Sequence, residues 1–524
     1  MSQCTLFPSR AVIAVFVAVS LPAVGQSPAK RTISLADLRD KIEGGWAGQM
    51  IGVSYGAPTE FRYREQIIPE DRLPVWTPDK VANALNQDDL YVDMTFAKVL
   101  DDKGLDATTE DFGAMFREAR YALWHANLAA RRALKRGVRA THSGTPQFNA
   151  HANDIDFQIE ADFIGLMAPG LPQSSNDICY RAGRVMNYGD GIFGGMFVSA
   201  MYAAAFFEDD PRKLVEAGLA VLPPQSPYAL LIRDVLDWSK QSPLDWTRVW
   251  QQIEEKWNKR EPCPEGARRP FNIDAKLNGS YIALGLLYGE KNFTKTVVIS
   301  TRAGQDSDCN PASAAGILGV VLGYSGIPDR WKSGIPAIAD QKFSYTDFTF
   351  RTIVDSTMKR AIAMVKRHGG NVDGDNLVVN PQRPKPAEAS IWDDYGSPVA
   401  RIEVADPQWQ WKGNWFTASD PRRGTRRVAR EKGAEASVSF EGTGAILVGP
   451  YLPTGGKAEV YLDGKLESVV DVYPDEDREK TGESIWHSFG LPKGKHTIRL
   501  VVLGEPYPGS QGADIGLNDL VVFR

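Results

Sequence analysis

The fold is decided by the stretch Gly304-Gln305-Asp306-Ser307-Asp308-Cys309-Asn310-Pro311, followed by Ala312-Ser313-Ala314-Ala315-Gly316-Ile317-Leu318-Gly319. Asp306 and Asp308 stand where a helix is expected to begin, with Pro311 suited to its first turn. A helix cap accounts for one such carboxylate, because a carboxylate accepts from exposed amides and suits the positive end of the helix dipole. A helix cap accounts less well for two carboxylates at the same helix start. The small residues that follow predict a closely packed, buried helix, and a buried start with two acids needs cations. We therefore favour a metal site over a simple cap.

A second acid pair opens another expected helix. It reads Asn86-Gln87-Asp88-Asp89-Leu90-Tyr91-Val92-Asp93, and Asp93 lies one turn after Asp89. Hard cations such as Mg²⁺ or Ca²⁺ prefer carboxylate and carbonyl oxygens as ligands. One or two such ions would suit a cluster made of Asp88, Asp89, Asp306 and Asp308.

The first expected helix carries a stripe of glycines. Ser34 is a candidate N-cap for a helix from Leu35 to about Ala57, which Pro58 stops. Glycines recur on one face of it at every fourth residue, at Gly44, Gly48, Gly52 and Gly56. Each costs roughly 1 kcal/mol relative to alanine in a helix. The stripe therefore predicts another backbone pressed against that face. The proline-containing stretch that follows, to about Leu85, predicts a loop over a site with Glu60 at its base.

Two further segments hold acids at expected helix starts. Residues 153–163 predict one helix, on which Asp156 and Glu160 share a face. Capping by Asn153 and Asp156, with Glu160 in solvent, fits this pattern as well as a functional site does. The turn Tyr188-Gly189-Asp190-Gly191 leads into an apolar helix. It is not a phosphate loop, because it lacks a GK[ST] ending and no strand precedes it.

Composition and charge narrow the class of protein. The chain has 524 residues, of which 43% are hydrophobic, and this predicts two or more domains with a large core. Its net charge of −5 gives no global basic field for nucleic acid. Two local basic runs fit solvated helix or loop faces: Arg131-Arg132 with Lys135-Arg136, and Arg422-Arg423 with Arg426-Arg427.

Residues 1–25 predict a secretory signal peptide. Arg10 supplies the positive region, Ala11 to Val24 the apolar core, and Ala23-Val24-Gly25 a small-x-small cleavage site. The apolar run is shorter than the ~20 residues of a spanning helix. We expect a periplasmic or secreted protein without membrane insertion after cleavage. Three cysteines would remain, Cys179, Cys263 and Cys309, which allow at most one bridge. Neither a CxxC motif nor a Cys/His zinc spacing occurs, and His151, like the other histidines, has no partner at metal spacing.

The character of the chain changes at about Gly369. Residues 371–398 are rich in proline, aspartate and asparagine and predict a linker. Residues 399–524 alternate short β-type runs with turns such as Asp463-Gly464, which predicts a separate β-sandwich. Three tryptophans in this region suit either its core or a sugar-stacking face: Trp409, Trp411 and Trp415.

Three motifs in order resemble those of the ADP-ribosylglycohydrolases, over about residues 34–368. They are G-x-x-x-G-x-x-x-E at Gly52, Gly56 and Glu60; the acid pair of Gln87-Asp88-Asp89; and D-x-D in Asp306-Ser307-Asp308-Cys309. The resemblance implies an all-α domain, here residues 31–370, with a binuclear Mg²⁺ centre in its cleft. That centre binds ribose hydroxyls and positions the water that cleaves a glycosidic bond.

The resemblance also implies roles for particular residues. The metal ligands would be Asp88, Asp89, Asp306 and Asp308, and Glu60 matches a flap glutamate. The chain departs from the pattern at Gln87, where the family usually has threonine, and at Cys309, where it has threonine or serine. A glutamine oxygen can ligate a hard cation, whereas a thiol is a poor ligand for one. We therefore expect one or two Mg²⁺ ions, with Ca²⁺ or Mn²⁺ as alternatives, and count Gln87 and Cys309 among the candidate ligands.

Together these features predict an exported, metal-dependent glycoside hydrolase of this helical fold with an appended β-sandwich. Export favours a glycan or small glycoside over an intracellular ADP-ribosylated protein. The candidate acids and bases are Glu60, Asp156 and Glu160, and the candidate substrate contacts are Asn153, Asp190 and Gly191. Two alternatives remain: an ADP-ribosyl hydrolase acting outside the cytoplasm, and a non-catalytic glycan-binding protein whose acids hold a structural cation.

Overall fold

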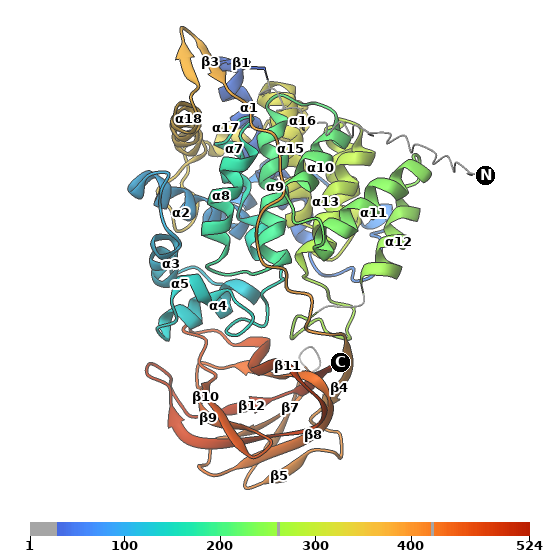
Figure 1. The fold of residues 1–524 in the computed structure, drawn as a ribbon, viewed down its shortest axis with the longest axis vertical. Helices are drawn as coiled ribbons and strands as arrows, with labels where there is room; N and C mark the ends of the chain where they lie inside the picture. Colours follow the sequence, from blue (N-terminus) through green and yellow to red (C-terminus); the bar gives the residue numbers. More distant parts are fainter. Residues whose placement is uncertain (1–28, 259–261, 421–423) are drawn as a thin grey trace, which may run out of the picture.

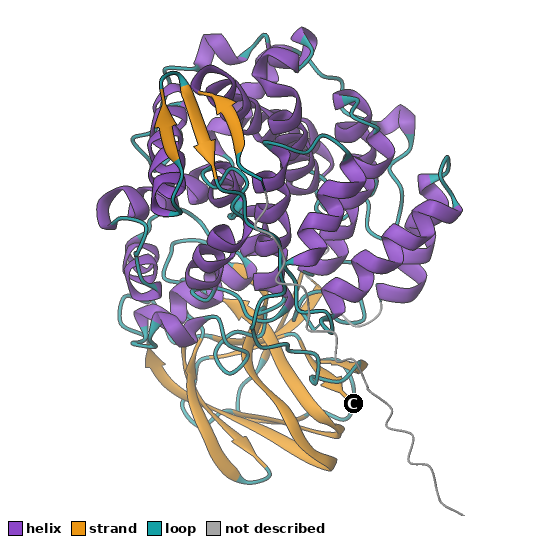
Figure 2. Ribbon diagram, turned by 45° about the horizontal axis from the view of Figure 1, so that its top comes forward, coloured by secondary structure: helices purple, strands orange, loops and turns teal. Residues whose placement is uncertain are grey.

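The chain forms a helical domain followed by an antiparallel β domain, as Figures 1 and 2 show. This computed structural model describes residues 29–524 except 259–261 and 421–423. The expected signal peptide and the pair Arg422-Arg423 lie outside the described residues. The predicted fold class, an all-α domain with a C-terminal β-sandwich, is confirmed.

The helices range in length from the four residues of α5 to the 22 residues of α1. Their bounds are α1 (Leu35–Gly56), α2 (Asp88–Lys103), α3 (Thr109–Glu118), α4 (His125–Lys135), α5 (Ala140–Ser143), α6 (Asp156–Ile159), α7 (Asp162–Leu166), α8 (Pro172–Gly183), α9 (Asp190–Ala205), α10 (Pro211–Ala220), α11 (Pro227–Gln241), α12 (Trp246–Trp257), α13 (Ala275–Gly289), α14 (Phe293–Arg302), α15 (Cys309–Gly326), α16 (Asp329–Lys332), α17 (Ile335–Ile338) and α18 (Phe350–Arg367). The loop predicted before α2 contains the 3₁₀ turns η1 (Ala57–Thr59), η2 (Glu70–Arg72) and η3 (Pro78–Asn86).

The strands form three antiparallel sheets, ordered β1-β3-β2, β10-β9-β11-β8-β13-β4 with β5 beside β8, and β12-β7-β6. Their bounds are β1 (Arg31–Ser34), β2 (Asn371–Asp373), β3 (Asn376–Val379), β4 (Pro398–Glu403), β5 (Gln410–Lys412), β6 (Phe416–Asp420), β7 (Gly424–Ala429), β8 (Glu435–Tyr451), β9 (Gly456–Leu462), β10 (Lys465–Asp471), β11 (Lys480–Pro506), β12 (Ile515–Leu517) and β13 (Asp519–Phe523).

Helices α1 and α15 pack backbone against backbone at the centre of the helical domain. A Cβ atom added to Gly44, Gly48 or Gly52 of α1 would lie 2.2 Å from a carbonyl oxygen of α15, and one on Gly56 would lie 2.0 Å from the carbonyl oxygen of Ser307. The close contact predicted from the glycine stripe is therefore confirmed. Its partner is the small-residue helix behind Asp306 and Asp308, so α1 holds the start of α15 beside the loop that carries Glu60.

The segment predicted as a linker begins later than expected. Residues 371–373 and 376–379 form β2 and β3, and β3 pairs with β1 in the register Arg31↔Val379. Residues 380–397 then run along the helical domain, where the amide of Ala387 donates to the carbonyl oxygen of Val221 at 2.9 Å. Further along, Trp392 is buried between the domains and packs edge-on against Phe489 of β11.

The single helix predicted for residues 153–163 is instead two short helices, α6 and α7. Glu160 and Ala161, with φ of −113° at each, leave the helical path between them. Glu160 is fully buried and accepts a hydrogen bond from the side-chain amide of Asn127. Burial of this acid against α4, rather than its exposure on a long helix, accounts for the break.

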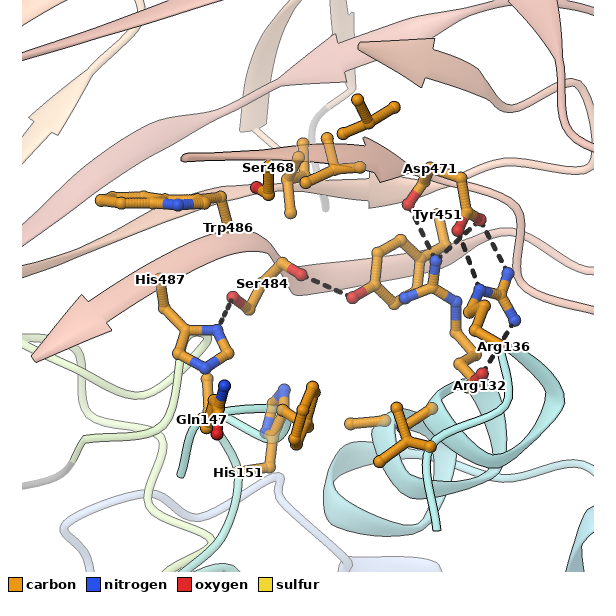
Figure 3. Close-up of a pocket in the computed structure, with 18 of the residues that line it drawn as sticks. Arg132, Arg136, Gln147, His151, Tyr451, Ser468, Asp471, Ser484, Trp486 and His487 are labelled. Carbon is orange, nitrogen blue, oxygen red and sulfur yellow. Dashed lines mark hydrogen bonds and ion pairs between the residues drawn. The ribbon is translucent and has the colours of Figure 1, made fainter. Parts of the chain in front are cut away.

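The basic run on α4 docks the β domain and is not solvated, which contradicts the sequence prediction. Arg131 and Arg132 are buried. Arg132 Nη2 lies 3.0 Å from Asp471 Oδ1, and Arg136 donates to both oxygens of the same carboxylate at 2.7 and 2.8 Å. Figure 3 shows these contacts at one end of a cavity of about 510 Å³ between the domains. The partner lies more than 330 residues away in sequence, so a local charge pattern could not reveal it.

The tryptophans of the β domain mainly fill its interior. Trp409 and Trp415 are buried, and Trp411 stacks on Trp409 with ring centroids 5.3 Å apart. The second basic run shares this environment in part, since the guanidinium of Arg427 lies 5.3 Å from the centre of the Trp411 ring. The core interpretation is thus favoured for Trp409 and Trp415.

Among the described residues, no single helix is long and apolar enough to cross a membrane, although the bent pair formed by Cys309–Gly326 and Asp329–Ile338 meets that length and composition.

Candidate functional site

A cavity of about 350 Å³ opens where the two acid-bearing helix starts meet. Its acidic wall comes from Asp88 at the start of α2, Asp306 before α15 and Glu60 after α1. Gln87, Asp156 and Cys309 also line it, so the cavity gathers residues from four distant parts of the sequence. The association of the two acid pairs, which ligand chemistry and the family resemblance both led us to expect, is present in the structure.

Cys309 marks the point where the two pairs meet. Its Sγ lies 3.3 Å from Asp89 Oδ2 and 3.8 Å from Asp308 Oδ1. Asp306, Asp308 and Cys309 each offer an atom within 4.8 Å of the other two. Asp89 and Asp308 are buried behind the cavity wall. Together with Asp88 and Asp306 they form the acid centre, the name used below for these four carboxylates.

A tight turn holds the D-x-D segment in place. Gly304 and Gln305 both adopt positive φ, 82° and 52°. The buried Gln305 side chain accepts from the amide of Asn272 at 3.0 Å and donates to the carbonyl oxygen of Pro270 at 2.9 Å. Its backbone carbonyl accepts from the amide of Phe61 at 2.9 Å. This turn therefore joins three segments of the cavity wall.

Burial raises the pKa of every carboxyl in the acid centre, and repulsion from neighbouring acids adds to this at Asp89, Asp306 and Asp308. Burial is the main cause for each, and it raises the pKa of Asp306 to about 8, with the charge of Glu60 adding to it. Burial and the neighbouring charge of Asp88 hold the pKa of Asp89 well above its usual value. Burial and Asp306 do the same for the pKa of Asp308. A divalent cation would relieve this repulsion.

Glu60 lies at the mouth of the cavity, exposed on one side. The repulsion from Asp308, followed by partial desolvation, raises the pKa of Glu60 to about 9. Its position is set by its neighbours, because Thr59 Oγ1 lies 2.8 Å from Ser307 Oγ and the amide of Phe61 bonds to Gln305. Glu60 is therefore accessible to a substrate and lies beside the acid centre.

Asp156 and Glu160 are placed differently from Glu60. Asp156 lines the cavity, but its two oxygens accept from the first amides of α4, those of Ala126 at 3.3 Å and Asn127 at 2.9 Å. Burial, with the charge of Asp154, raises the pKa of Asp156 to about 7. Glu160 lies behind Asn127 and does not line the cavity. Asp156 thus positions the start of α4, and the buried Glu160 holds the side chain of Asn127 in place.

The three predicted substrate contacts do not line this cavity. Asn153, Asp190 and Gly191 are fully buried. Asn153 Nδ2 lies 3.5 Å from the carbonyl oxygen of Trp392. Trp392 also packs against Gly189, in the turn before α9. Asp190 accepts from the amide of Tyr228 at 3.3 Å. Asn153 therefore contacts the segment of residues 380–397, whereas Asp190 and Gly191 pack within the helical domain.

Several cavity residues were missed by the sequence analysis. Tyr91, Trp124, His125 and Phe271 supply aromatic rings, and Glu265 supplies a further half-buried acid. Tyr91 follows Asp88 by almost one helical turn, so the helix period could have identified it. The others come from segments without a recognisable motif. Lys480 of β11 lies with its Nζ 4.1 Å from the centre of the Trp124 ring, so the β domain reaches the rim of the cavity.

The acid centre fits a hard divalent cation. Asp89 Oδ1 and Asp306 Oδ1 are buried and accept no hydrogen bond from the residues that the structure describes. All of its donors are carboxylate oxygens, the ligands that Mg²⁺, Mn²⁺ and Ca²⁺ prefer. Gln87 adds an amide at the cavity wall, while the Cys309 thiol is the ligand least suited to such an ion.

The match to a family model decides the family. The sequence model of ADP-ribosylglycohydrolase matches residues 34–361. The chain belongs to the ADP-ribosylglycohydrolase family. This is a family of metal-dependent hydrolases, and the matched range contains both acid pairs and Glu60.

Other similarities of this chain are shorter or more distant. It is 33% identical over 103 residues to the A type blood alpha-D-galactosamine galactosaminidase of Flavonifractor plautii, covering 19% of this chain and 9% of the relative. It is 33% identical over 102 residues to the A type blood N-acetyl-alpha-D-galactosamine deacetylase of the same organism, covering 19% of this chain and 13% of the relative. The chain thus spans roughly a tenth of the length of these curated relatives.

Two solved structures are also similar. One, described as an ADP-ribosylglycohydrolase-related protein complex, is 15% identical with a TM-score of 0.35 and covers 63% of this chain and 99% of its own. The other, a carbohydrate-binding module CBM36 in complex with calcium and xylotriose, is 11% identical with a TM-score of 0.18 and covers 24% of this chain and all of its own. At these TM-scores neither supports a functional argument.

Proposed function

We propose that this protein is an exported, metal-dependent hydrolase that cleaves a glycosidic bond of a glycan or small glycoside. The observation that carries the proposal is the meeting of two acid pairs, at the starts of α2 and α15, with Asp88 and Asp306 on the wall of one cavity and Asp89 and Asp308 buried behind it. Membership of a hydrolase family and the short similarity to a galactosaminidase support carbohydrate as the substrate class.

The cavity suits a sugar in size and lining. A volume of about 350 Å³ falls within the range of small-molecule sites. Tyr91, Trp124 and Phe271 present aromatic rings, and Arg64, whose guanidinium lies 4.9 Å from the centre of the Phe271 ring, adds a donor. These groups would bind and orient the substrate at the acid centre.

The acid centre, with Gln87 beside it, would hold one or two Mg²⁺ ions. When bound, such ions polarise sugar hydroxyls and lower the pKa of a ligated water. Glu60 is the chain's own proton-transfer group, since it is exposed and lines the cavity beside the acid centre. Asp156 orients α4, whose Asn127 side chain lines the same wall.

The test is product release by mass spectrometry, with and without EDTA. The substrates are furanosides, pyranosides, polysaccharides, and peptides carrying ADP-ribose on arginine or serine. We expect free sugar that is lost with EDTA. We also expect a loss of about 10³-fold for Asp306→Asn, about 4 kcal/mol of transition-state stabilisation. Asp329→Asn, which changes an exposed acid at the start of α16, is the matched control and should leave activity unchanged.

The other outcomes overturn the proposal in distinct ways. Free ADP-ribose, lost with EDTA, would mean that the substrate is an ADP-ribosylated molecule. A rise in melting temperature with Mg²⁺ but no product from any substrate would support a non-catalytic glycan-binding protein. Export is tested separately, by the intact mass of the periplasmic protein in a bacterial host, which should begin at Gln26.

A further inference from the structure

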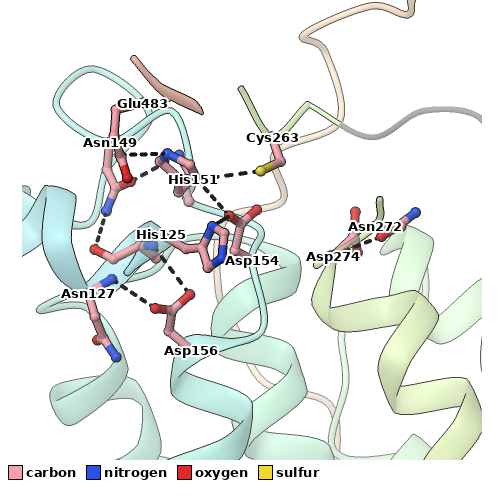
Figure 4. A network of polar contacts seen from close by, with 12 residues as sticks. His125, Asn127, Asn149, His151, Asp154, Asp156, Cys263, Asn272, Asp274 and Glu483 are labelled. Carbon is pink, nitrogen blue, oxygen red and sulfur yellow. Dashed lines mark hydrogen bonds and ion pairs between the residues drawn. The ribbon is translucent and has the colours of Figure 1, made fainter. Parts of the chain in front are cut away.

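A second cluster of potential metal ligands lies beside the cavity, and it shares no residue with the acid centre. It consists of His125 at the start of α4, His151 and Asp154 before α6, and Cys263 in the segment before α13. One ligand atom from each of the four lies within 4.8 Å of the other three. Figure 4 shows their side chains converging from three segments of the chain.

The distances in this His/Asp/Cys cluster are close to those of a four-coordinate site. His151 Nδ1 lies 2.7 Å from Asp154 Oδ2 and 3.5 Å from Cys263 Sγ. His125 Nδ1 lies 3.9 Å from the same Asp154 oxygen. Zinc bonds of about 2.0–2.3 Å in a tetrahedron separate the ligand atoms by about 3.3–3.8 Å. Small side-chain shifts would therefore complete the geometry.

The surroundings of the cluster also favour a cation. Asp154 is fully buried, and its Oδ1 accepts no hydrogen bond within the described part of the chain. His151 is buried as well, and His125 is half-buried. A carboxylate and a thiol thus face two imidazoles in a site removed from water.

The ring nitrogen of His151 that faces away from the cluster lies near a carboxylate, as is usual for a metal-bound histidine. The far nitrogen of His151, Nε2, lies 3.5 Å from Glu483 Oε2 of β11. A ligating imidazole commonly donates its other N–H to a carboxylate, which fixes the ring and strengthens it as a ligand. Here that carboxylate comes from the β domain.

We propose that His125, His151, Asp154 and Cys263 bind one Zn²⁺ ion in a closed structural site that ties the β domain to the wall of the cavity. Nitrogen and sulfur ligands select zinc, whereas Mg²⁺ and Ca²⁺ require oxygen. The protein would then bind two different metals, Zn²⁺ at this cluster and Mg²⁺ at the acid centre, because the ligand atoms of the two sites differ. The zinc site supports the cavity through His125, whose ring stacks on Phe271 with centroids 5.6 Å apart.

The first test uses the full chain, purified from zinc-supplemented medium and dialysed against zinc-free buffer containing Mg²⁺. Elemental analysis should find about one zinc ion per chain, and zinc X-ray absorption should show one sulfur at about 2.3 Å with nitrogen and oxygen at about 2.0–2.2 Å. Absence of retained zinc, or a shell without sulfur, overturns the proposal. This measurement needs no variant and no activity, so it is independent of the proposed function.

Variants then assign the ligands. Cys263→Ser should abolish the sulfur signal, and Glu483→Gln should weaken zinc affinity by about 10–100-fold. Cys179→Ser, at a buried cysteine of α8 whose Sγ lies 3.8 Å from the carbonyl oxygen of Gly195, should retain the zinc. Cys309→Ser should retain it as well. Loss of the sulfur signal in Cys309→Ser with its retention in Cys263→Ser would place the zinc in the acid centre and overturn the assignment.

Discussion

At the scale of single residues, the site depends on how Glu60 is held. Its carboxyl lies beside Asp308 and Asp88, which keep the pKa of Glu60 high, yet one side of it faces solvent. The neighbouring Thr59 and Phe61 fix its backbone to the D-x-D segment. A carboxyl group in this position can exchange a proton with a substrate, and the stability of the fold does not depend on it.

We therefore expect Glu60→Gln to lower kcat by about 10²–10⁴-fold with little change in melting temperature. The control is Glu65→Gln, which removes the charge of an exposed glutamate that does not line the cavity. Steady-state kinetics and thermal unfolding of both variants provide the check. An unchanged kcat in Glu60→Gln would assign proton transfer to another group, with Glu265 the next candidate on the cavity wall.

Cys309 is the least suitable ligand in the acid centre, because a thiol binds hard cations poorly. Cys309→Ser would place a hydroxyl oxygen close to Asp89, in the position where Sγ now lies 3.3 Å away. We expect Mg²⁺ to bind up to about tenfold more tightly, equivalent to about 1.4 kcal/mol. Isothermal titration calorimetry measures this, with Cys179→Ser as the control. Weaker binding would show that the thiol makes a contact that oxygen cannot replace.

The sequence allowed the acid centre to be predicted, because paired acids at two helix starts are difficult to account for as caps. It did not allow the His/Asp/Cys cluster to be predicted, because its members stand at positions 125, 151, 154 and 263 without a ligand spacing. The predicted contacts Asn153 and Asp190 do not line the cavity, although each stands at an expected helix start. A polar residue at a helix start has the same local pattern whether it faces a ligand or a covering segment.

At the scale of secondary structure elements, the contact of α1 with α15 links the fold to the site. Gly48→Ala would bring a Cβ within 2.2 Å of the carbonyl oxygen of Ala315, so one helix must move. We expect a loss of about 1–3 kcal/mol in the free energy of unfolding, and weaker Mg²⁺ binding because α15 begins at the acid centre.

Gly326→Ala is the control for this effect. Gly326 is exposed after the kink at Gly323 of α15, and a Cβ there would meet only Leu322 Cβ, 3.2 Å away. Denaturant unfolding and Mg²⁺ titration of both variants separate the close contact of α1 with α15 from the effect of replacing a glycine elsewhere. Equal effects in the two variants would contradict the close-packing argument. This contact was predictable, since four glycines on one helix face are costly unless another backbone packs there. The break between α6 and α7 was not, since it depends on burial of Glu160 by α4.

At the scale of the whole molecule, the β domain contributes to the cavity and to the contacts that hold the two domains together. The β domain contributes Lys480 at the cavity rim, Glu483 beside His151, and Asp471 to the arginines of α4. The domain order was predictable from the change in composition near Gly369. The docking was not, because the run Arg131–Arg136 matches an exposed helix face unless its distant partners are known.

The interface should weaken in acid through Asp471. Burial alone would raise the pKa of this carboxyl, but the hydrogen bonds from Arg136 and the charge of Arg132 outweigh burial and lower it. A folded-state pKa below the unfolded value of about 3.9 means that the ionised group stabilises the folded protein above about pH 4. That contribution is lost as the pH falls through the folded-state pKa.

Asp471→Asn should therefore cost about 1–3 kcal/mol in the free energy of unfolding at pH 7, and the difference from the wild type should shrink progressively below about pH 4. The control Asp355→Asn removes an exposed ion pair to Arg39 and should cost less than about 1 kcal/mol. Calorimetric unfolding between pH 7 and pH 3 measures both. A cost for Asp471→Asn that is the same at pH 3 as at pH 7 would contradict an ionic interface, and one no larger than that of Asp355→Asn would mean that α4 does not hold the β domain through this carboxylate.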